Sequence, residues 1–114
     1  MLKVLLIDDE ERATDSLRRL IEKYIIETNK VWICKDARKA AETIHVVQPD
    51  LIFLDIRMPH LSGFDILNKL PNRNAAIIFT TAYDEYAIRA IRFSAFDYLL
   101  KPVDSNELTA AVKR

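Results

Sequence analysis

Short apolar runs recur along the chain and have the length of β-strands. Most positions within them are apolar, whereas a strand with one face in water alternates apolar and polar residues. Such runs are typical of parallel strands that helices cover on both faces. We predict five strands, at residues 4–7, 31–34, 51–54, 75–79 and 98–100.

Between these runs lie segments in which apolar residues recur with the period of a helix. The clearest spans residues 11–26, where an apolar stripe lies opposite a charged face. A similar segment follows each later strand, and this alternation predicts five β-α units and the α/β fold class. The stripe consists of Leu17, Leu20, Ile21, Tyr24 and Ile25, and the later helices are predicted at residues 36–47, 62–70, 85–93 and 106–113.

The composition is that of a single globular domain. Of the 114 residues, 50% are hydrophobic and 30% are charged, so one core accounts for residues 1–114. The last predicted helix runs up to Arg114, and we expect the polypeptide to continue in a longer protein.

The charge balance and the cysteine content limit the expected partners and the expected cellular compartment. The 17 basic and 17 acidic residues balance, which argues against a broad basic surface for nucleic acid, so DNA binding would require another domain. The single cysteine, Cys34, has no partner for an internal disulfide, and no charged-then-apolar leader precedes the first strand. No apolar run approaches the roughly 20 residues of a membrane-spanning helix. We expect a cytoplasmic protein without a membrane segment.

Polar side chains stand where four of the predicted strands end. Parallel α/β sheets bind ligands at the carboxyl ends of their strands, and all four loops open on the same edge. We therefore expect these side chains to lie near one another. They are Asp8, Asp9 and Glu10 after the first strand, Asp55 after the third, Thr80 and Thr81 after the fourth, and Lys101 after the fifth.

The acidic members of this set predict a magnesium site. Converging carboxylates repel one another unless a hard cation shares their charge, and magnesium prefers such oxygen ligands. Magnesium held in this way keeps positions open for phosphate oxygens and neutralises charge during phosphoryl transfer. We expect Asp55 to be the nucleophile that forms an acyl phosphate. Lys101 would pair with one phosphoryl oxygen, and the Thr81 hydroxyl would donate a hydrogen bond to another.

A simpler interpretation exists for part of the set. An acidic pair after a strand is commonly a helix N-cap, since Asp accepts N–H hydrogen bonds and suits the positive end of the helix dipole. Taken alone, Asp8 and Asp9 fit that interpretation. The addition of Asp55, Thr81 and Lys101 at the same edge of successive strands favours a phosphoryl-transfer site.

Four motifs together resemble the receiver domain of bacterial two-component response regulators. They are LLIDDE at residues 5–10, LDIRMP at residues 54–59 followed by Ser62-Gly63, then Thr81-Ala82, and YLLKP at residues 98–102. The resemblance spans the whole chain and implies a parallel sheet in the CheY-like order 2-1-3-4-5 with helices on both faces. It also implies that Asp55 takes its phosphoryl group from a phosphohistidine of a sensor kinase. Such a domain is a signalling switch that catalyses its own phosphorylation and dephosphorylation.

The same resemblance implies roles for individual residues. The ligands of a Mg²⁺ ion would be Asp8, Asp9, Asp55 and the backbone carbonyl of Arg57. Lys101 contacts the phosphoryl group, Thr81 follows it, and Tyr98 changes rotamer in step with Thr81. The Lys101-Pro102 peptide bond is expected to be cis.

Two further segments look like those of regulators whose output is a LytTR-type DNA-binding domain: TTAYDEYAI at residues 80–88 and FDYLLKP at residues 96–102. Transcriptional control would then belong to an output domain C-terminal to residue 114. In the family, the face formed by the fourth helix, the fifth strand and the fifth helix commonly mediates dimerisation, so a homodimer through this face is an expectation. One departure is Ser94, where the family often has a glycine that ends a helix.

Three other classes stay open. A magnesium-dependent phosphatase of the haloacid-dehalogenase type also uses an aspartate nucleophile, but it has a second aspartate two residues later, where this chain has Arg57. A flavodoxin-like cofactor carrier would need an anion-binding turn after the first strand, where this chain is acidic. A receiver-like binding module that never becomes phosphorylated is disfavoured by the complete acidic site.

Overall fold

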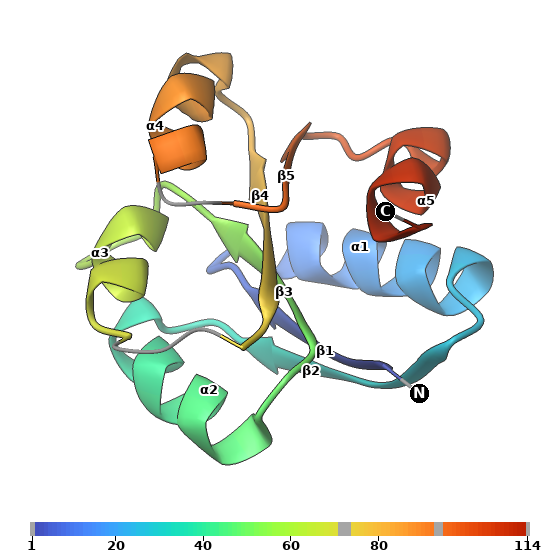
Figure 1. Cartoon of the computed structure of the whole chain (residues 1–114), viewed down its shortest axis with the longest axis horizontal. Helices are drawn as coiled ribbons and strands as arrows, with labels where there is room; N and C mark the ends of the chain where they lie inside the picture. The colour runs from blue at the N-terminus through green and yellow to red at the C-terminus, as the bar shows by residue number, and fades with distance from the viewer. Residues whose placement is uncertain (1, 71–73, 93–94, 114) are drawn as a thin grey trace.

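Parallel ladders join all the strands that the computed structural model describes within residues 2–70, 74–92 and 95–113. They form one sheet in the order β2-β1-β3-β4-β5, which confirms the expected fold class and strand order (Figure 1). The strands are β1 (Leu2–Ile7), β2 (Thr28–Cys34), β3 (Leu51–Asp55), β4 (Ala76–Thr81) and β5 (Asp97–Leu100).

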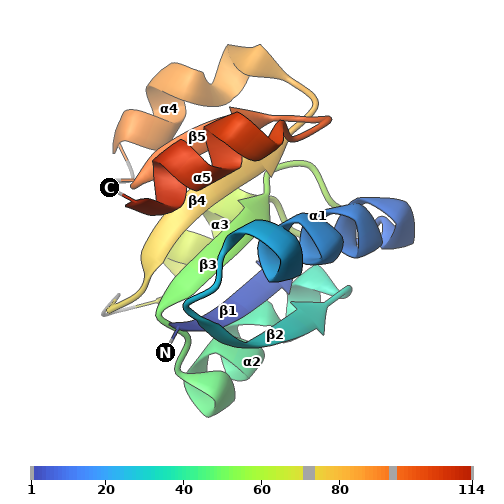
Figure 2. The ribbon, with the colours of Figure 1, turned by 90° about the vertical axis from the view of Figure 1, so that its right-hand side faces the viewer.

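Helices cover both faces of this sheet. α1 and α5 pack on one face, and α2, α3 and α4 pack on the opposite face (Figure 2). Single turns of 3-10 helix, Ala37–Lys39 and Asp84–Tyr86, precede α2 and α4. The helices are α1 (Glu11–Tyr24), α2 (Ala40–Val47), α3 (Gly63–Asn68), α4 (Ala87–Arg92) and α5 (Ser105–Lys113).

The central strand β1 shows how the core divides between the two faces. Val4 and Leu6 join the apolar cluster under α1 and α5, whereas Leu5 and Ile7 join the cluster under α2, α3 and α4. Each of these four side chains is buried, and burial of one such side chain contributes roughly 1.5–3 kcal/mol. Successive residues of a strand point to opposite faces, so a strand that is covered twice needs the uninterrupted apolar run seen in the sequence.

Several element boundaries differ from the prediction. β2 begins at Thr28 rather than at residue 31. The apolar-run criterion missed this start because residues 28–30 are polar, and Lys30 is exposed on this edge strand, which pairs with β1 alone. α1 ends at Tyr24, two residues before the predicted end. Tyr24, at the end of the predicted apolar stripe, is 42% exposed, whereas Leu17, Ile21 and Ile25 of the same stripe are buried.

The fourth helix also begins later than predicted. Its first residues form the 3-10 turn Asp84–Tyr86, and the α-helix begins only at Ala87. The predicted helix end at Phe93, the Ser94 position and Arg114 lie outside the described residues. None of the helices in the described ranges has the length and apolar character needed to cross a membrane.

Candidate phosphoryl-transfer site

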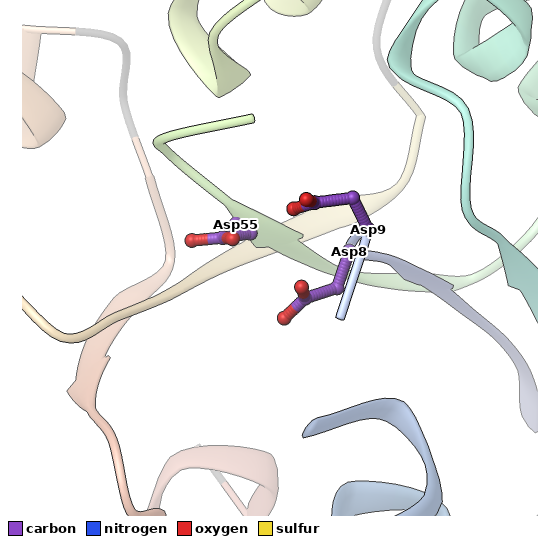
Figure 3. Close-up of side chains that lie close together, drawn as sticks. All are labelled: Asp8, Asp9 and Asp55. Carbon is purple, nitrogen blue, oxygen red and sulfur yellow. The ribbon is translucent and has the colours of Figure 1, made fainter. Parts of the chain in front are cut away.

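Three aspartates converge at the carboxyl edge of the sheet. β1 and β3 are neighbours with Ile7 opposite Leu54, so the residues that follow them, Asp8 and Asp55, lie next to each other. One carboxylate oxygen each from Asp8, Asp9 and Asp55 lies within 4.8 Å of the others. Figure 3 shows all three carboxylates turned to the same side of the strand ends. Three of the side chains predicted to meet are therefore brought together.

The start of α3 packs closely against the backbone of Asp55 and Ile56. Gly63 donates its N–H to the Ile56 carbonyl at 2.9 Å, and a Cβ at this position would lie only 2.6 Å from the Asp55 carbonyl oxygen. Ser62 and Asp65 form a capping box that begins the helix there. The single glycine of the chain is thus explained by the close approach of two backbone segments.

Lys101 joins the acidic cluster from the end of β5. Its ammonium lies 2.7 Å from an Asp8 oxygen, 3.4 Å from Glu10 and 3.5 Å from Asp55. The Lys101 N–H also donates to the Thr81 carbonyl at 2.8 Å, which continues the β4–β5 ladder beyond the strand. The peptide bond between Lys101 and Pro102 is cis, as predicted.

Burial and charge perturb the ionisation of this cluster. Burial and the neighbouring Asp8 charge raise the pKa of Asp55 to about 7, although Lys101 acts in the opposite direction. Burial acts to lower the pKa of Lys101, but its hydrogen bond to Asp8 and the charge of Asp55 outweigh that effect and raise it. The rise in the pKa of Lys101 reflects the carboxylates around it, whereas that of Asp55 reflects its burial first and the Asp8 charge second.

The donor set fits a hard divalent cation. Three carboxylate oxygens within 4.8 Å of one another, two of them on buried side chains, match the oxygen ligands that Mg²⁺ takes in proteins. The candidate ligands are Asp8, Asp9 and Asp55. Arg57 follows Asp55 by two residues, in the loop between β3 and α3.

Thr81 and Tyr98 lie on the other side of Asp55, on the neighbouring strands β4 and β5. Thr81 is buried at the end of β4, and its hydroxyl oxygen accepts the N–H of Tyr83 at 3.3 Å. Tyr98 is half-buried beside Phe79, with 6.4 Å between ring centroids, and its hydroxyl donates to the Tyr83 carbonyl. Burial raises the pKa of Tyr98. Thr80, also noted at the strand end, lies buried within β4 opposite Asp55.

Sequence reasoning missed two features of this site. Glu10 is mostly exposed, yet it reaches Lys101, which no spacing rule indicates. Tyr83 is contacted by Thr81, by Tyr98 and by Arg57, whose guanidinium carbon lies 4.5 Å from the ring centroid. Its position two residues beyond Thr81 was the only available signal.

A doubly wound sheet with an aspartate cluster and a lysine at its carboxyl edge is the arrangement that the predicted phosphoryl-transfer site requires. The chain matches the model of the response regulator receiver domain over residues 4–113 and belongs to that family. Membership of this family argues against both the haloacid-dehalogenase phosphatase and the flavodoxin-like carrier.

Relatives with curated sequences are similar over the whole of this chain. It is 47% identical to an uncharacterized response regulatory protein of Yersinia pestis over 116 residues, and 41% identical to the transcriptional regulatory protein BtsR of Escherichia coli over 115 residues. In both cases the alignment covers 100% of this chain and 48% of the relative. The chain therefore spans about half the length of the curated relatives it matches.

Solved structures show the same fold. The response regulatory domain of mrkE from Klebsiella pneumoniae is 29% identical, with a TM-score of 0.88 over 98% of this chain and 93% of that one. The receiver domain of a LuxO repressor from Vibrio parahaemolyticus is 26% identical, with a TM-score of 0.86 over 98% of this chain and 87% of that one.

Proposed function

We propose that Asp55 is the phosphoacceptor of this receiver domain and that Asp8, Asp9, Lys101 and Thr81 assist its phosphorylation. The observation that carries the proposal is the convergence of three carboxylates and one ammonium on the end of β3. A structural N-cap would explain Asp8, whose carboxylate accepts the Glu10 N–H at 3.0 Å. It would not explain why a buried Asp55 and a largely buried Lys101 face the same carboxylate.

In the proposed reaction an Asp55 oxygen attacks the phosphorus of a phosphohistidine. The new oxygen–phosphorus bond forms as the nitrogen–phosphorus bond breaks, and the histidine ring keeps the electron pair of the broken bond. Lys101 balances the charge on a phosphoryl oxygen, and the Thr81 hydroxyl donates a hydrogen bond to another. Dephosphorylation transfers the group to water and restores the Asp55 carboxylate.

Mg²⁺ would be held by Asp8, Asp9, Asp55 and the Arg57 backbone carbonyl. When bound, it supplies positive charge that neutralises the phosphoryl oxygens and the repulsion among the carboxylates. Lys101 would then share the Asp8 and Asp55 carboxylates with a second cation, which would weaken its ion pair with Asp8. Its ammonium would be available to pair with a phosphoryl oxygen on Asp55.

Phosphorylation would be transmitted through Thr81 and Tyr98. A phosphoryl group adds negative charge and acceptor oxygens beside Thr81, and its hydroxyl, which now accepts the Tyr83 N–H, can turn to donate to the new group. Tyr98 hydrogen-bonds to the same Tyr83, so its rotamer is sensitive to that rearrangement. The domain acts as a two-state switch rather than as an enzyme with a separate substrate.

The partners follow from this role. The domain acts in the cytoplasm, its phosphoryl donor is a sensor histidine kinase, and the effector is a C-terminal output domain that binds DNA, of the LytTR type. The name of the BtsR relatives as transcriptional regulatory proteins supports control of transcription. Homodimerisation through α4, β5 and α5 is supported by large apolar side chains exposed there. Ile91, Phe96 and Leu100 are 75%, 44% and 44% exposed.

The test is phosphorylation of the purified domain by acetyl phosphate with Mg²⁺, followed by intact-mass spectrometry. Wild-type protein should gain one phosphoryl group, and both Asp55→Asn and omission of Mg²⁺ should abolish the gain. Asp15→Asn is the matched control, because Asp15 is an exposed aspartate of α1 outside the cluster. Equal phosphorylation of wild type and Asp55→Asn would refute the assignment of Asp55.

A further inference from the structure

Tyr83 lies where three separate contacts meet. Its N–H donates to the Thr81 hydroxyl oxygen at 3.3 Å, and its carbonyl accepts the hydroxyl of Tyr98. Its ring faces the guanidinium of Arg57, with 4.5 Å between the guanidinium carbon and the ring centroid. One residue of the loop between β4 and α4 therefore touches the loop that follows Asp55 and both proposed switch residues.

We infer that Tyr83 is the positioning residue that couples the acidic site to Tyr98, and that the Arg57 side chain holds Tyr83 in place. This inference deepens the proposed switch and rests on it. It adds to the role of Thr81 a second connection, which runs from the loop after Asp55 through the Arg57 side chain. Both connections reach Tyr98 at one atom, the Tyr83 carbonyl oxygen.

The Arg57 guanidinium has the geometry of a clamp on this ring. A planar, delocalised cation stacks favourably on an aromatic face, whereas an ammonium acts as a point charge. Among residues 2–70, 74–92 and 95–113, Arg57 forms no ion pair with a carboxylate, so the Tyr83 ring is the contact that orients it. Movement of the loop after Asp55 is thus passed directly to Tyr83.

The ring of Tyr83 is also tied to the aromatic core below it. Tyr83 meets Tyr86 edge to face at 6.3 Å, and Tyr86 meets Phe64 at 6.2 Å between centroids. Phe64 packs on Phe79 at 5.1 Å, and Phe79 lies against Tyr98. The Tyr98 ring is therefore held by the core, while its hydroxyl is held by Tyr83. Displacement of Tyr83 removes the acceptor of the Tyr98 hydroxyl and leaves the ring packing and the backbone contact of that hydroxyl with Tyr86, a weaker restraint that allows Tyr98 to change rotamer.

The decisive experiment measures the χ1 rotamer of Tyr98 by NMR three-bond couplings in the unphosphorylated, metal-free domain. Wild-type protein should show the values of a single rotamer. Tyr83→Leu keeps the backbone carbonyl but removes the ring, and Arg57→Met keeps the alkyl chain but removes the guanidinium. Both should shift the couplings towards rotamer averaging. Tyr83→Phe keeps the stacked ring and should behave as wild type.

Two further variants separate coupling from general loosening of the loop. Arg89→Met removes another guanidinium–ring stack, over Phe64 at 4.4 Å, without touching Tyr83, and should leave the Tyr98 couplings unchanged. The double variant of Arg57→Met and Tyr83→Leu should show no more averaging than either single variant, because both break the same contact. Unchanged couplings in Tyr83→Leu, or equal averaging in Tyr83→Phe and Tyr83→Leu, would overturn the inference.

A second measurement distinguishes failure of this coupling from failure of the phosphoacceptor assignment. Beryllofluoride with Mg²⁺, a phosphoryl mimic, should shift the amide signals of residues 55–57 in wild type and in Tyr83→Leu. The Tyr98 ring signals should also shift in wild type, and this second shift should be absent in Tyr83→Leu. A full Tyr98 response in Tyr83→Leu would contradict the coupling. Absence of any amide response in wild type would instead contradict the site, while the rotamer couplings would still decide the role of Tyr83.

Discussion

The ammonium of Lys101 bridges Asp8 and Asp55, at 2.7 Å from the first carboxylate and 3.5 Å from the second. Both carboxylates are buried and stand at the ends of the neighbouring strands β1 and β3. One cation thus offsets two buried anions, and burial together with the neighbouring Asp8 charge keeps the pKa of Asp55 high. The ionisation of this pair therefore offers direct tests of the site.

Replacement of Lys101 by Met should raise the pKa of Asp55 above its wild-type value of about 7, because Lys101 is the charge that holds it down. The measurement is a ¹³C NMR titration of the aspartate carboxyl groups in metal-free protein. Lys35→Met is the control, since Lys35 pairs at 3.2 Å with the exposed Glu11 outside the cluster. An unchanged or lower Asp55 pKa in Lys101→Met would contradict the ion pair.

The stability of the metal-free domain should fall as the pH rises from about 4 to about 7. The folded state raises the pKa of Asp55 from its ordinary value of 3.8 to about 7, so within this window the folded protein binds a proton that the unfolded chain releases. Each unit of pKa difference corresponds to about 1.4 kcal/mol, so the loss is of the order of a few kcal/mol. Urea unfolding of wild type and Asp55→Asn at each pH isolates the effect. The free energy of unfolding of Asp55→Asn should not fall in this way. Parallel pH profiles of the two proteins would contradict the raised pKa of Asp55.

Mg²⁺ should reverse that loss, because it binds the ionised carboxylates of the folded state. A ligand at 100 times its dissociation constant stabilises by about 2.7 kcal/mol, and the effect should be greater at pH 8 than at pH 5. Asp9→Asn should weaken the stabilisation at a given Mg²⁺ concentration, as measured by thermal unfolding. Glu11→Gln, which alters an exposed carboxylate next to the site, should respond to Mg²⁺ as wild type does.

The location of the site could be predicted because it depends on topology alone. Once five parallel strands are recognised, the residues that follow them are expected at the same edge of the sheet. The positions of Asp8, Asp55 and Lys101 at this edge followed from that expectation. The same apolar-run criterion failed for β2. Its first residues, from Thr28 to Lys30, are polar, and Lys30 is exposed on this edge strand, so they carry no apolar signal.

The role of Tyr83 could not be predicted from the sequence for a different reason. Its contacts with Arg57 and Tyr98 join loops that are distant along the chain, and two of the three contacts use backbone atoms of Tyr83. Every residue has these backbone atoms, so the residue types along the sequence do not indicate such contacts. The pairing of Lys101 with Glu10 could not be predicted from the sequence either, because it depends on the conformations of two long, flexible side chains.

Gly63→Ala should destabilise the domain and displace the backbone at Asp55. An added Cβ would lie 2.6 Å from the Asp55 carbonyl oxygen and 3.3 Å from the Ile56 Cα, both backbone atoms that cannot rotate away. Overpacking of this kind costs about 1–3 kcal/mol, which urea unfolding will measure. Asn68→Ala, at an exposed position of the same helix, should change stability by no more than about 0.5 kcal/mol. Equal effects of the two substitutions would contradict the close approach.

Gln48→Gly should stabilise the domain, although it removes a side-chain hydrogen bond. Gln48 ends α2 in the left-handed region, at φ 52° and ψ 59°, where a residue with a Cβ is strained by roughly 1 kcal/mol. Its amide donates to the His45 carbonyl at 2.8 Å, but this bond is exposed to water and contributes little. Gln48→Ala separates the two effects, since it loses the hydrogen bond and keeps the strain. Urea unfolding should rank Gly above wild type and Ala below it, and an Ala variant as stable as the Gly variant would show that backbone strain is absent at this position.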